Sequence, residues 1–163
     1  MAATVATDAY RLAMRRVVSP VAVITVADGN DRNGLTATAV CSASTEPPTV
    51  VVCINSEAKA LALICRTGRF AVNFLSDEQS EIARAFSTRG LAGETRLKLG
   101  DWTTLTTGAP VLKDAVSVFD CLTDRSIPCG NHEILLGRVV GVDSTEASAL
   151  LYRDEFFRRV APE

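Results

Sequence analysis

The amino-acid sequence predicts a mainly β protein, an antiparallel Greek-key β-barrel with helices inserted between some of its strands. Apolar and β-branched runs recur along the 163 residues and outnumber the helical segments. Turn-forming sequences join these runs, and regular helices do not alternate with them, which argues against a doubly wound parallel sheet. Long adjacent runs with a tight turn between them are typical of antiparallel barrels.

The first third of the chain predicts one helix and three strands. Apolar residues at helical spacing over residues 7–17 indicate an amphipathic helix, with Thr7 as its cap. The strands follow as β-branched runs, with the turn sequence DGNDRNG between the first two and Pro47-Pro48 before the third. These strands are expected at residues 21–26, 35–40 and 49–54.

Two more helices are predicted in the middle of the chain. The first should span residues 56–67 with Ser56 as its N-cap. Ser76 and Gln79 have the spacing of a capping box, so the second should run from there to about Phe86.

The remainder of the chain adds strands. A polar segment rich in Gly and Thr, residues 87–108, is expected to be irregular, and residues 128–131 should form a turn. Further strands are expected at residues 70–75, 115–124, 133–143 and 150–152. No internal repeat, low-complexity tract or linker interrupts the sequence, so a single domain over residues 1–163 is predicted.

Composition restricts the possible partners. Apolar residues make up 47% and charged residues 22% of the chain, which permits a real core. The net charge of −2 argues against nucleic acid or an anionic membrane as the main partner. No apolar run is long enough to span a bilayer, and the N-terminus lacks the basic start of a signal peptide, so a cytoplasmic protein is expected.

Reactive side chains are scarce. The five cysteines form no CxxC pair, and buried free thiols in a reducing compartment are the expected state. Because His132 is the only histidine, no His-rich metal site is predicted. The sequence also has no GxGxxG, GxxxxGK[ST], HExxH or GxSxG motif. An enzyme with so little acid–base machinery would depend on a cofactor.

Two segments carry residues suited to a flat, phosphorylated ligand. NGLTATAVCSAS, residues 33–44, has small hydroxyl side chains that let a backbone approach a ring; the alternative is a Thr-rich edge strand. Asn55 and Ser56 precede a helix whose N-terminus, with Lys59, suits a phosphate. The alternative is that Ser56 only caps this helix and Lys59 only faces water.

Two further segments also carry residues that could contact a flat, phosphorylated ligand. Arg89 could bind a phosphate with Phe86 packed beneath the cofactor; alternatively Phe86 belongs to the core and Arg89 interacts with a helix C-terminus. His132 stands where a turn meets a strand and could contact a ligand, or could be a half-exposed residue at the barrel rim.

Together and in this order, the segments resemble the short-chain flavin reductase family, which supplies reduced flavin to two-component monooxygenases. The resemblance covers residues 10–159 and rests on the joint order and spacing of its motifs. These motifs are SPVAVITV, GLTATAVCSAS, EPPTVVVCINS, GRFAVNFLSDEQ, FDC, GNHEILLGRV and LLYRD.

The resemblance implies a split β-barrel of the FMN-binding type that forms a homodimer, with the flavin near the dimer interface. It implies hydride transfer from NADH or NADPH to FMN or FAD, and His132 would lie beside the nicotinamide. The positions expected around the ring and ribityl chain are Asn33, Thr36, Thr38, Ala39, Ser42 and Tyr152. The positions expected to hold the phosphate end or close over it are Asn55, Ser56, Lys59, Phe86, Ser87 and Arg89.

The sequence departs from the family pattern at two places. The family often has a basic residue directly after the position of Asn55, whereas Ser56 and Glu57 follow here, and Glu57 would repel a phosphate. The family turn often reads Gly-Thr-His or Gly-Asp-His, and here it is Gly-Asn-His, in which Asn131 can still form a hydrogen bond.

Three other functions are compatible with such a barrel. One is a reductase of another acceptor, such as a corrinoid, with FMN as a prosthetic group. Another is an enzyme like pyridoxamine-phosphate oxidase, whose basic phosphate-binding residues match poorly. The third is a non-catalytic flavin-binding module. In all of these the sequence leaves the choice between FMN and FAD, and between NADH and NADPH, open.

Overall fold

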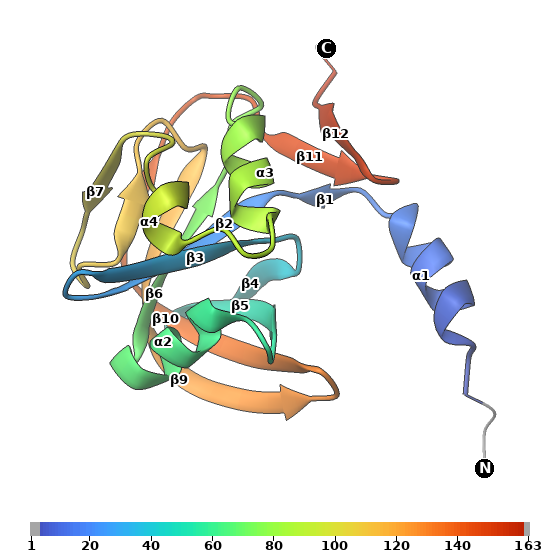
Figure 1. Cartoon of the computed structure of the whole chain (residues 1–163), viewed down its shortest axis with the longest axis horizontal. Helices are drawn as coiled ribbons and strands as arrows, with labels where there is room; N and C mark the ends of the chain where they lie inside the picture. The colour runs from blue at the N-terminus through green and yellow to red at the C-terminus, as the bar shows by residue number, and fades with distance from the viewer. Residues whose placement is uncertain (1–3, 162–163) are drawn as a thin grey trace.

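Seven antiparallel strands form one sheet in the order β3-β2-β6-β9-β10-β5-β4 in the computed structural model, which describes residues 4–161 (Figure 1). The strands are β2 (Ala22–Asp28), β3 (Asp31–Ala37), β4 (Val40–Thr45), β5 (Pro48–Asn55), β6 (Arg69–Phe74), β9 (Ser117–Cys129) and β10 (His132–Ser144). The two edge strands, β3 and β4, follow each other in the chain, but no ladder pairs them within the described residues. The barrel is therefore split between them, which confirms the predicted fold.

The remaining strands and the helices lie outside this sheet. The strands among them are β1 (Ser19–Pro20), β7 (Trp102–Thr104), β8 (Pro110–Leu112), β11 (Leu150–Arg153) and β12 (Phe156–Arg159). The helices are α1 (Thr7–Arg15), α2 (Lys59–Thr67), α3 (Ser80–Ser87) and α4 (Gly93–Arg96). In Figure 1, α3 and α4 lie on one side of β3, while α2, β4 and β5 lie on the other.

The core has two parts that meet at β2. Six consecutive residues of β2 are buried, because both faces of the strand are covered. Ile24 packs in the part that contains Leu61 and Ile64 of α2, while Val23 packs in the part that contains Ala83 of α3. Burial of a large aliphatic side chain stabilises the fold by about 1.5–3 kcal/mol. Helices α2 and α3 are thus held at fixed places beside β3.

Helix starts differ from the predicted ones. Ala58, not Ser56, is the N-cap of α2, and it makes no side-chain cap hydrogen bond. The Asn55 side chain causes this shift, because its Oδ1 accepts a hydrogen bond from the Glu57 amide at 2.9 Å and forms a turn before the helix. The N-cap of α1 is Ala6 rather than Thr7.

Half of the predicted capping box before α3 is present. Gln79 Oε1 accepts a hydrogen bond from the Ser76 amide at 2.9 Å, but α3 itself begins at Ser80. The segment expected to be irregular contains α4 and β7, and the expected strand 35–40 is divided between β3 and β4 by a bend at Thr38 and Ala39.

The expectation that the cysteines are buried was wrong. Of the five free cysteines only Cys121 is buried; Cys53 is half-buried, and Cys41, Cys65 and Cys129 are exposed. Helix α1 forms as predicted, but none of its residues is buried, and Tyr10 and Leu12 are exposed. Figure 1 shows α1 projecting away from the barrel.

None of the helices in the described part of the chain is long and apolar enough to cross a membrane.

Candidate functional site

The bend between β3 and β4 forms the centre of the candidate site. Thr38 and Ala39 are both exposed there, and so is Ser42 on the edge strand β4. The Cys53 amide donates a hydrogen bond to the Ala39 carbonyl at 3.0 Å, which fixes the bend against β5. A run of small side chains on a fixed backbone allows a planar ligand to approach closely.

One end of the site is formed where β5 and β10 pair. His132 lies directly opposite Asn55 in this ladder, and the Ser56 amide donates to the Asn131 carbonyl at 3.0 Å. His132 is half-buried, and its Nδ1 lies 2.8 Å from the Asn131 Oδ1. The structure therefore places His132 next to Asn55 and Ser56, while the β3–β4 bend lies along the opposite edge of β5.

The start of α2 is less suited to a phosphate than the sequence indicates. The amides of Ser56, Glu57 and Ala58 all donate hydrogen bonds within the chain, to the Asn131 carbonyl, the Asn55 side chain and the Asn55 carbonyl. They are thus unavailable to an anion. Lys59 is exposed and forms no salt bridge with another described residue, so its ammonium group remains available.

The other side of β3 faces α3. The Thr36 hydroxyl donates to the Ala83 carbonyl at 2.7 Å, which joins the two elements. Phe86 is 2% exposed and packs against Gly34 and Trp102, with 5.5 Å between the two ring centroids. A Cβ at Gly34 would lie 2.8 Å from the Phe86 ring, so only glycine permits this approach. Phe86 is therefore a core residue, the alternative that the sequence left open.

Polar groups at the end of α3 are accessible. Ser87 is exposed and its hydroxyl donates to the Arg84 carbonyl at 2.9 Å, which leaves its lone pairs available. Arg89 is exposed, and it forms no salt bridge or side-chain hydrogen bond with another described residue. Its guanidinium group is thus free to bind an anion.

Asn33 and Tyr152 are placed by other contacts. The Asn33 Oδ1 accepts from the Gly34 amide at 2.8 Å, so this side chain turns back onto its own strand. Tyr152 on β11 is half-buried and lies against Phe157, with ring centroids 5.8 Å apart. Both rings pack on the part of the core that contains α3, so Tyr152 belongs to the α3 side of the site.

Arg96 on α4 is a residue that the sequence did not single out. Its guanidinium group donates to the Gly34 carbonyl at 2.6 Å and to the Thr88 carbonyl at 2.7 Å. Partial burial lowers the pKa of Arg96. It lies in a segment predicted to be irregular, and no motif marks it.

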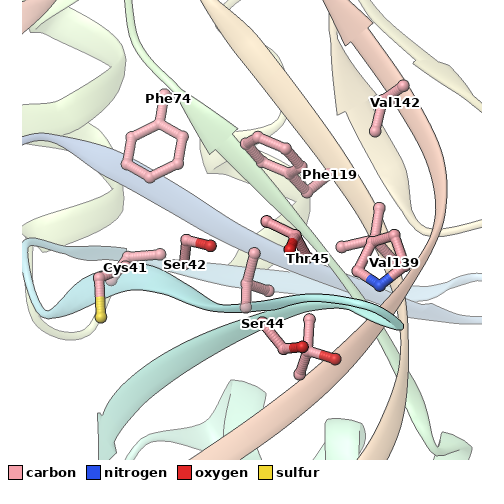
Figure 2. Close-up of a pocket in the computed structure, with 12 residues that line it drawn as sticks. Cys41, Ser42, Ser44, Thr45, Phe74, Phe119, Val139 and Val142 are labelled. Carbon is pink, nitrogen blue, oxygen red and sulfur yellow. The ribbon is translucent and has the colours of Figure 1, made fainter.

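An apolar groove of about 340 Å³ opens beside the site, at the mouth of the barrel (Figure 2). Figure 2 shows the Phe74 and Phe119 rings and the side chains of Val139 and Val142 on one wall, with Ser42 on the opposite strand. The remaining lining residues are Val40, Cys41, Ser44, Thr45, Pro48, Thr49 and Val50. The wall residues lie on β6, β9 and β10, far apart in sequence, so their meeting could not be predicted.

Comparison with known proteins identifies the family. The flavin reductase like domain family matches residues 14–161. The FMN reductase (NADH) RutF 1 of Methylorubrum extorquens strain PA1 is 41% identical over 160 residues, which cover 96% of this chain and 79% of that protein. This chain belongs to the flavin reductase family.

Solved structures agree with this membership. A flavin reductase candidate from Haemophilus somnus 129PT superposes with a TM-score of 0.93 at 36% identity, covering 96% of this chain and all of that one. BorF, the flavin reductase component of a bacterial two-component tryptophan halogenase, superposes with a TM-score of 0.88 at 26% identity, covering 97% of this chain and all of BorF. The fold and the enzyme class, a flavin reductase, are therefore confirmed.

Proposed function

We propose that this flavin reductase takes a hydride from NADH and reduces FMN, which then leaves to serve a partner monooxygenase. The observation that carries the choice of substrates is the 41% identity with an FMN reductase (NADH) over almost the whole chain. The structure supports it with a surface suited to a flat ring, the exposed bend at Thr38 and Ala39, with His132 across β5 from it.

The ring of the flavin would lie against the β3–β4 bend. Thr38, Ala39 and Ser42 are small and exposed, so their backbone and hydroxyl groups can hydrogen-bond the polar edge of the ring. Thr36 already donates its hydroxyl hydrogen to α3, so toward a ligand it can act only as an acceptor. When bound, the flavin supplies the chemistry by accepting a hydride and later passing on electrons.

The phosphate end would lie at the end of α3. Arg89 offers a planar guanidinium group without a partner among the described residues, which suits bidentate binding of a phosphate. Ser87 can hydrogen-bond the same group. Lys59 on the other side of β3 is also free, but Glu57 stands two residues before it and offsets its charge.

His132 would position the nicotinamide. Because the Asn131 Oδ1 can only accept a hydrogen bond, it holds the proton of the imidazole on Nδ1. The Nε2 lone pair is then able to accept a hydrogen bond from the carboxamide of the nicotinamide. The chain thus contributes orientation and exclusion of water, and hydride transfer needs no general base.

Two copies of the chain would form the working unit. The apolar groove at the barrel mouth and the exposed apolar side chains of α1 leave hydrophobic surface uncovered. A twofold dimer would cover both with identical surfaces from the partner. All five cysteines are free in the structure, which supports our proposal that the enzyme acts in the reducing cytoplasm.

Oxidation of NADH by the purified protein, with FMN, FAD or no flavin added, tests this function. We expect oxidation that requires and saturates with added FMN, and a lower kcat/KM with FAD. Equal rates with and without added flavin would show that the flavin is a tightly held prosthetic group. Absence of oxidation by the folded protein under all three conditions would contradict the proposal.

A further inference from the structure

Arg96 joins three segments that surround the candidate site. From α4 its Nη1 donates to the Gly34 carbonyl on β3 at 2.6 Å, with the Asn33 Oδ1 at 3.4 Å. Its Nη2 donates to the Thr88 carbonyl, just past the end of α3, at 2.7 Å. A single guanidinium group therefore links β3, α3 and α4.

If Arg96 contributed only to the stability of the fold, its environment would be unfavourable. No carboxylate lies within salt-bridge distance of Arg96 among the described residues, and its buried Nε has no hydrogen-bond partner there. Burial without a counter-ion disfavours the charged form. An apolar side chain of similar volume would fill the same space at less cost.

A second arginine already attaches α4 to β3. Arg32 on β3 forms two hydrogen bonds with Glu94 on α4, at 2.9 Å and 2.7 Å, on the exposed side. Gly93 also lies so close to the Arg32 carbonyl that a Cβ there would overlap it. The contact that Arg96 alone provides is the one with Thr88, the residue directly before Arg89.

Thr88 is fixed from both sides. Its amide and its hydroxyl both approach the Arg84 carbonyl, at 3.1 Å and 2.8 Å, and its own carbonyl is held by Arg96. The peptide that leads into Arg89 therefore has a set orientation, and Gly90 turns the chain away with a φ of 78°.

Arg96 also changes the electrostatics of this place. The end of α3 is a helix C-terminus, where unpaired carbonyl groups carry partial negative charge and repel anions. The guanidinium group of Arg96 bonds the Thr88 carbonyl directly after this helix end and adds a positive charge there. This positive charge offsets the repulsion between the helix end and the negative charge of a phosphate.

We propose that Arg96 is a positioning residue for the phosphate of the flavin, acting through Thr88 on Arg89. This inference rests on the proposed function, in which Arg89 meets the phosphate. It predicts that loss of Arg96 selectively weakens use of a phosphorylated flavin, while a flavin without a phosphate is unaffected.

FMN and riboflavin, which differ only in the phosphate, test the proposal. For Arg96→Gln we expect the KM for FMN to rise about tenfold, the size typical of one charge-assisted hydrogen bond. The KM for riboflavin, the KM for NADH and kcat at saturating flavin should each change by less than about twofold. Arg32→Gln, which breaks the exposed contact between the same two elements, is the matched control and should leave the ratio of the two flavin KM values unchanged.

A double variant tests whether Arg96 acts through Arg89. Arg89→Gln with Arg96→Gln should bind FMN no more weakly than Arg89→Gln alone, because the second change has nothing left to position. If Arg96→Gln does not fold, Arg96→Lys can reach one carbonyl only and should show the same selective loss in smaller degree.

Several results would overturn the proposal. Equal losses with FMN and riboflavin, an additive double variant, or the same change in Arg32→Gln would each show that Arg96 is only structural. If the unmodified protein reduces FMN and prefers it to riboflavin while Arg96→Gln keeps that preference, the inference fails and the proposed function stands. If the unmodified protein reduces neither flavin, the proposed function fails, and this inference fails with it.

Discussion

The Asn131 side-chain oxygen lies 2.8 Å from Nδ1 of His132, in the turn that opens β10. An amide oxygen can only accept a hydrogen bond, so this contact requires a proton on Nδ1 of His132. His132 lies opposite Asn55 in the sheet, at the place where we propose that the nicotinamide meets the flavin.

The first prediction concerns this pair. His132→Ala should raise the KM for NADH about tenfold, as expected for one lost hydrogen bond of about 1–1.5 kcal/mol, and should leave FMN binding nearly unchanged. Asn131→Ala should give a smaller rise, because the ring stays but its proton is no longer fixed. Steady-state kinetics give the first quantity, and quenching of flavin fluorescence gives the second. Loss of FMN binding in His132→Ala would contradict the assignment.

The second prediction decides which cation holds the phosphate. Arg89→Gln should raise the KM for FMN about tenfold, since a charge-assisted contact is lost. Lys59→Gln should change it by less than about twofold, since exposed charges contribute little. Riboflavin kinetics serve as the control, and both variants should match the unmodified protein there. A larger effect at Lys59 would place the phosphate at the start of α2.

The third prediction concerns the stability at alkaline pH. Burial raises the pKa of the Cys121 thiol from 9.0 to about 12, and the nearby Asp120 carboxylate adds to the rise. Between these values the unfolded chain releases the thiol proton while the folded chain keeps it. The free energy of unfolding should therefore fall as the pH rises through this window, by up to about 1.4 kcal/mol per pH unit from this group.

Urea unfolding of Cys121→Ala and of the unmodified protein, at about pH 8 and about pH 10, measures this effect. The variant should lose less stability between the two pH values than the unmodified protein does. Cys65→Ala, on the solvent side of α2, is the control and should behave like the unmodified protein. Identical pH dependence in all three proteins would show that Cys121 is not responsible.

The fourth prediction concerns the apolar groove. Val142 is 66% exposed and lines the groove, so Val142→Asp places a charge where the partner is expected to pack. We expect light scattering to give twice the chain mass of 17.4 kDa for the unmodified protein and a single chain mass for the variant. Leu99→Asp introduces the same charge at an exposed leucine outside the groove and should remain dimeric. A monomeric unmodified protein would contradict the dimer.

Much of the fold could be predicted, because residues adjacent in sequence determine where most of its strands form. The β-branched run from Val21 to Val26 forms most of β2, as predicted. The turn after it was predicted too long, because only Gly29 and Asn30 separate β2 from β3, which begins at Asp31 inside the predicted turn. The helix starts were misplaced because side chains such as Asn55 bond backbone amides in a geometry that spacing alone does not reveal.

The site could be predicted only in part. His132, Asn55 and the β3–β4 bend were found because they lie in motifs shared with a family. Arg96 was missed because it binds the backbone carbonyl groups of Gly34 and Thr88. Every residue has such a group, so the sequence does not show which ones an arginine will contact. The groove was missed because residues of five strands, β4, β5, β6, β9 and β10, line it.

Bleaching of FMN absorbance by NADH, without oxygen and with a catalytic amount of the protein, tests the central claim most directly. Without oxygen the reduced flavin accumulates, so the transfer itself is observed apart from any later reaction. We predict complete bleaching of FMN present in large excess over the protein, at a rate proportional to protein concentration and greatly reduced in Arg89→Gln at low FMN. Bleaching limited to one flavin per chain, or none at all, would contradict the claim that this protein reduces and releases flavin.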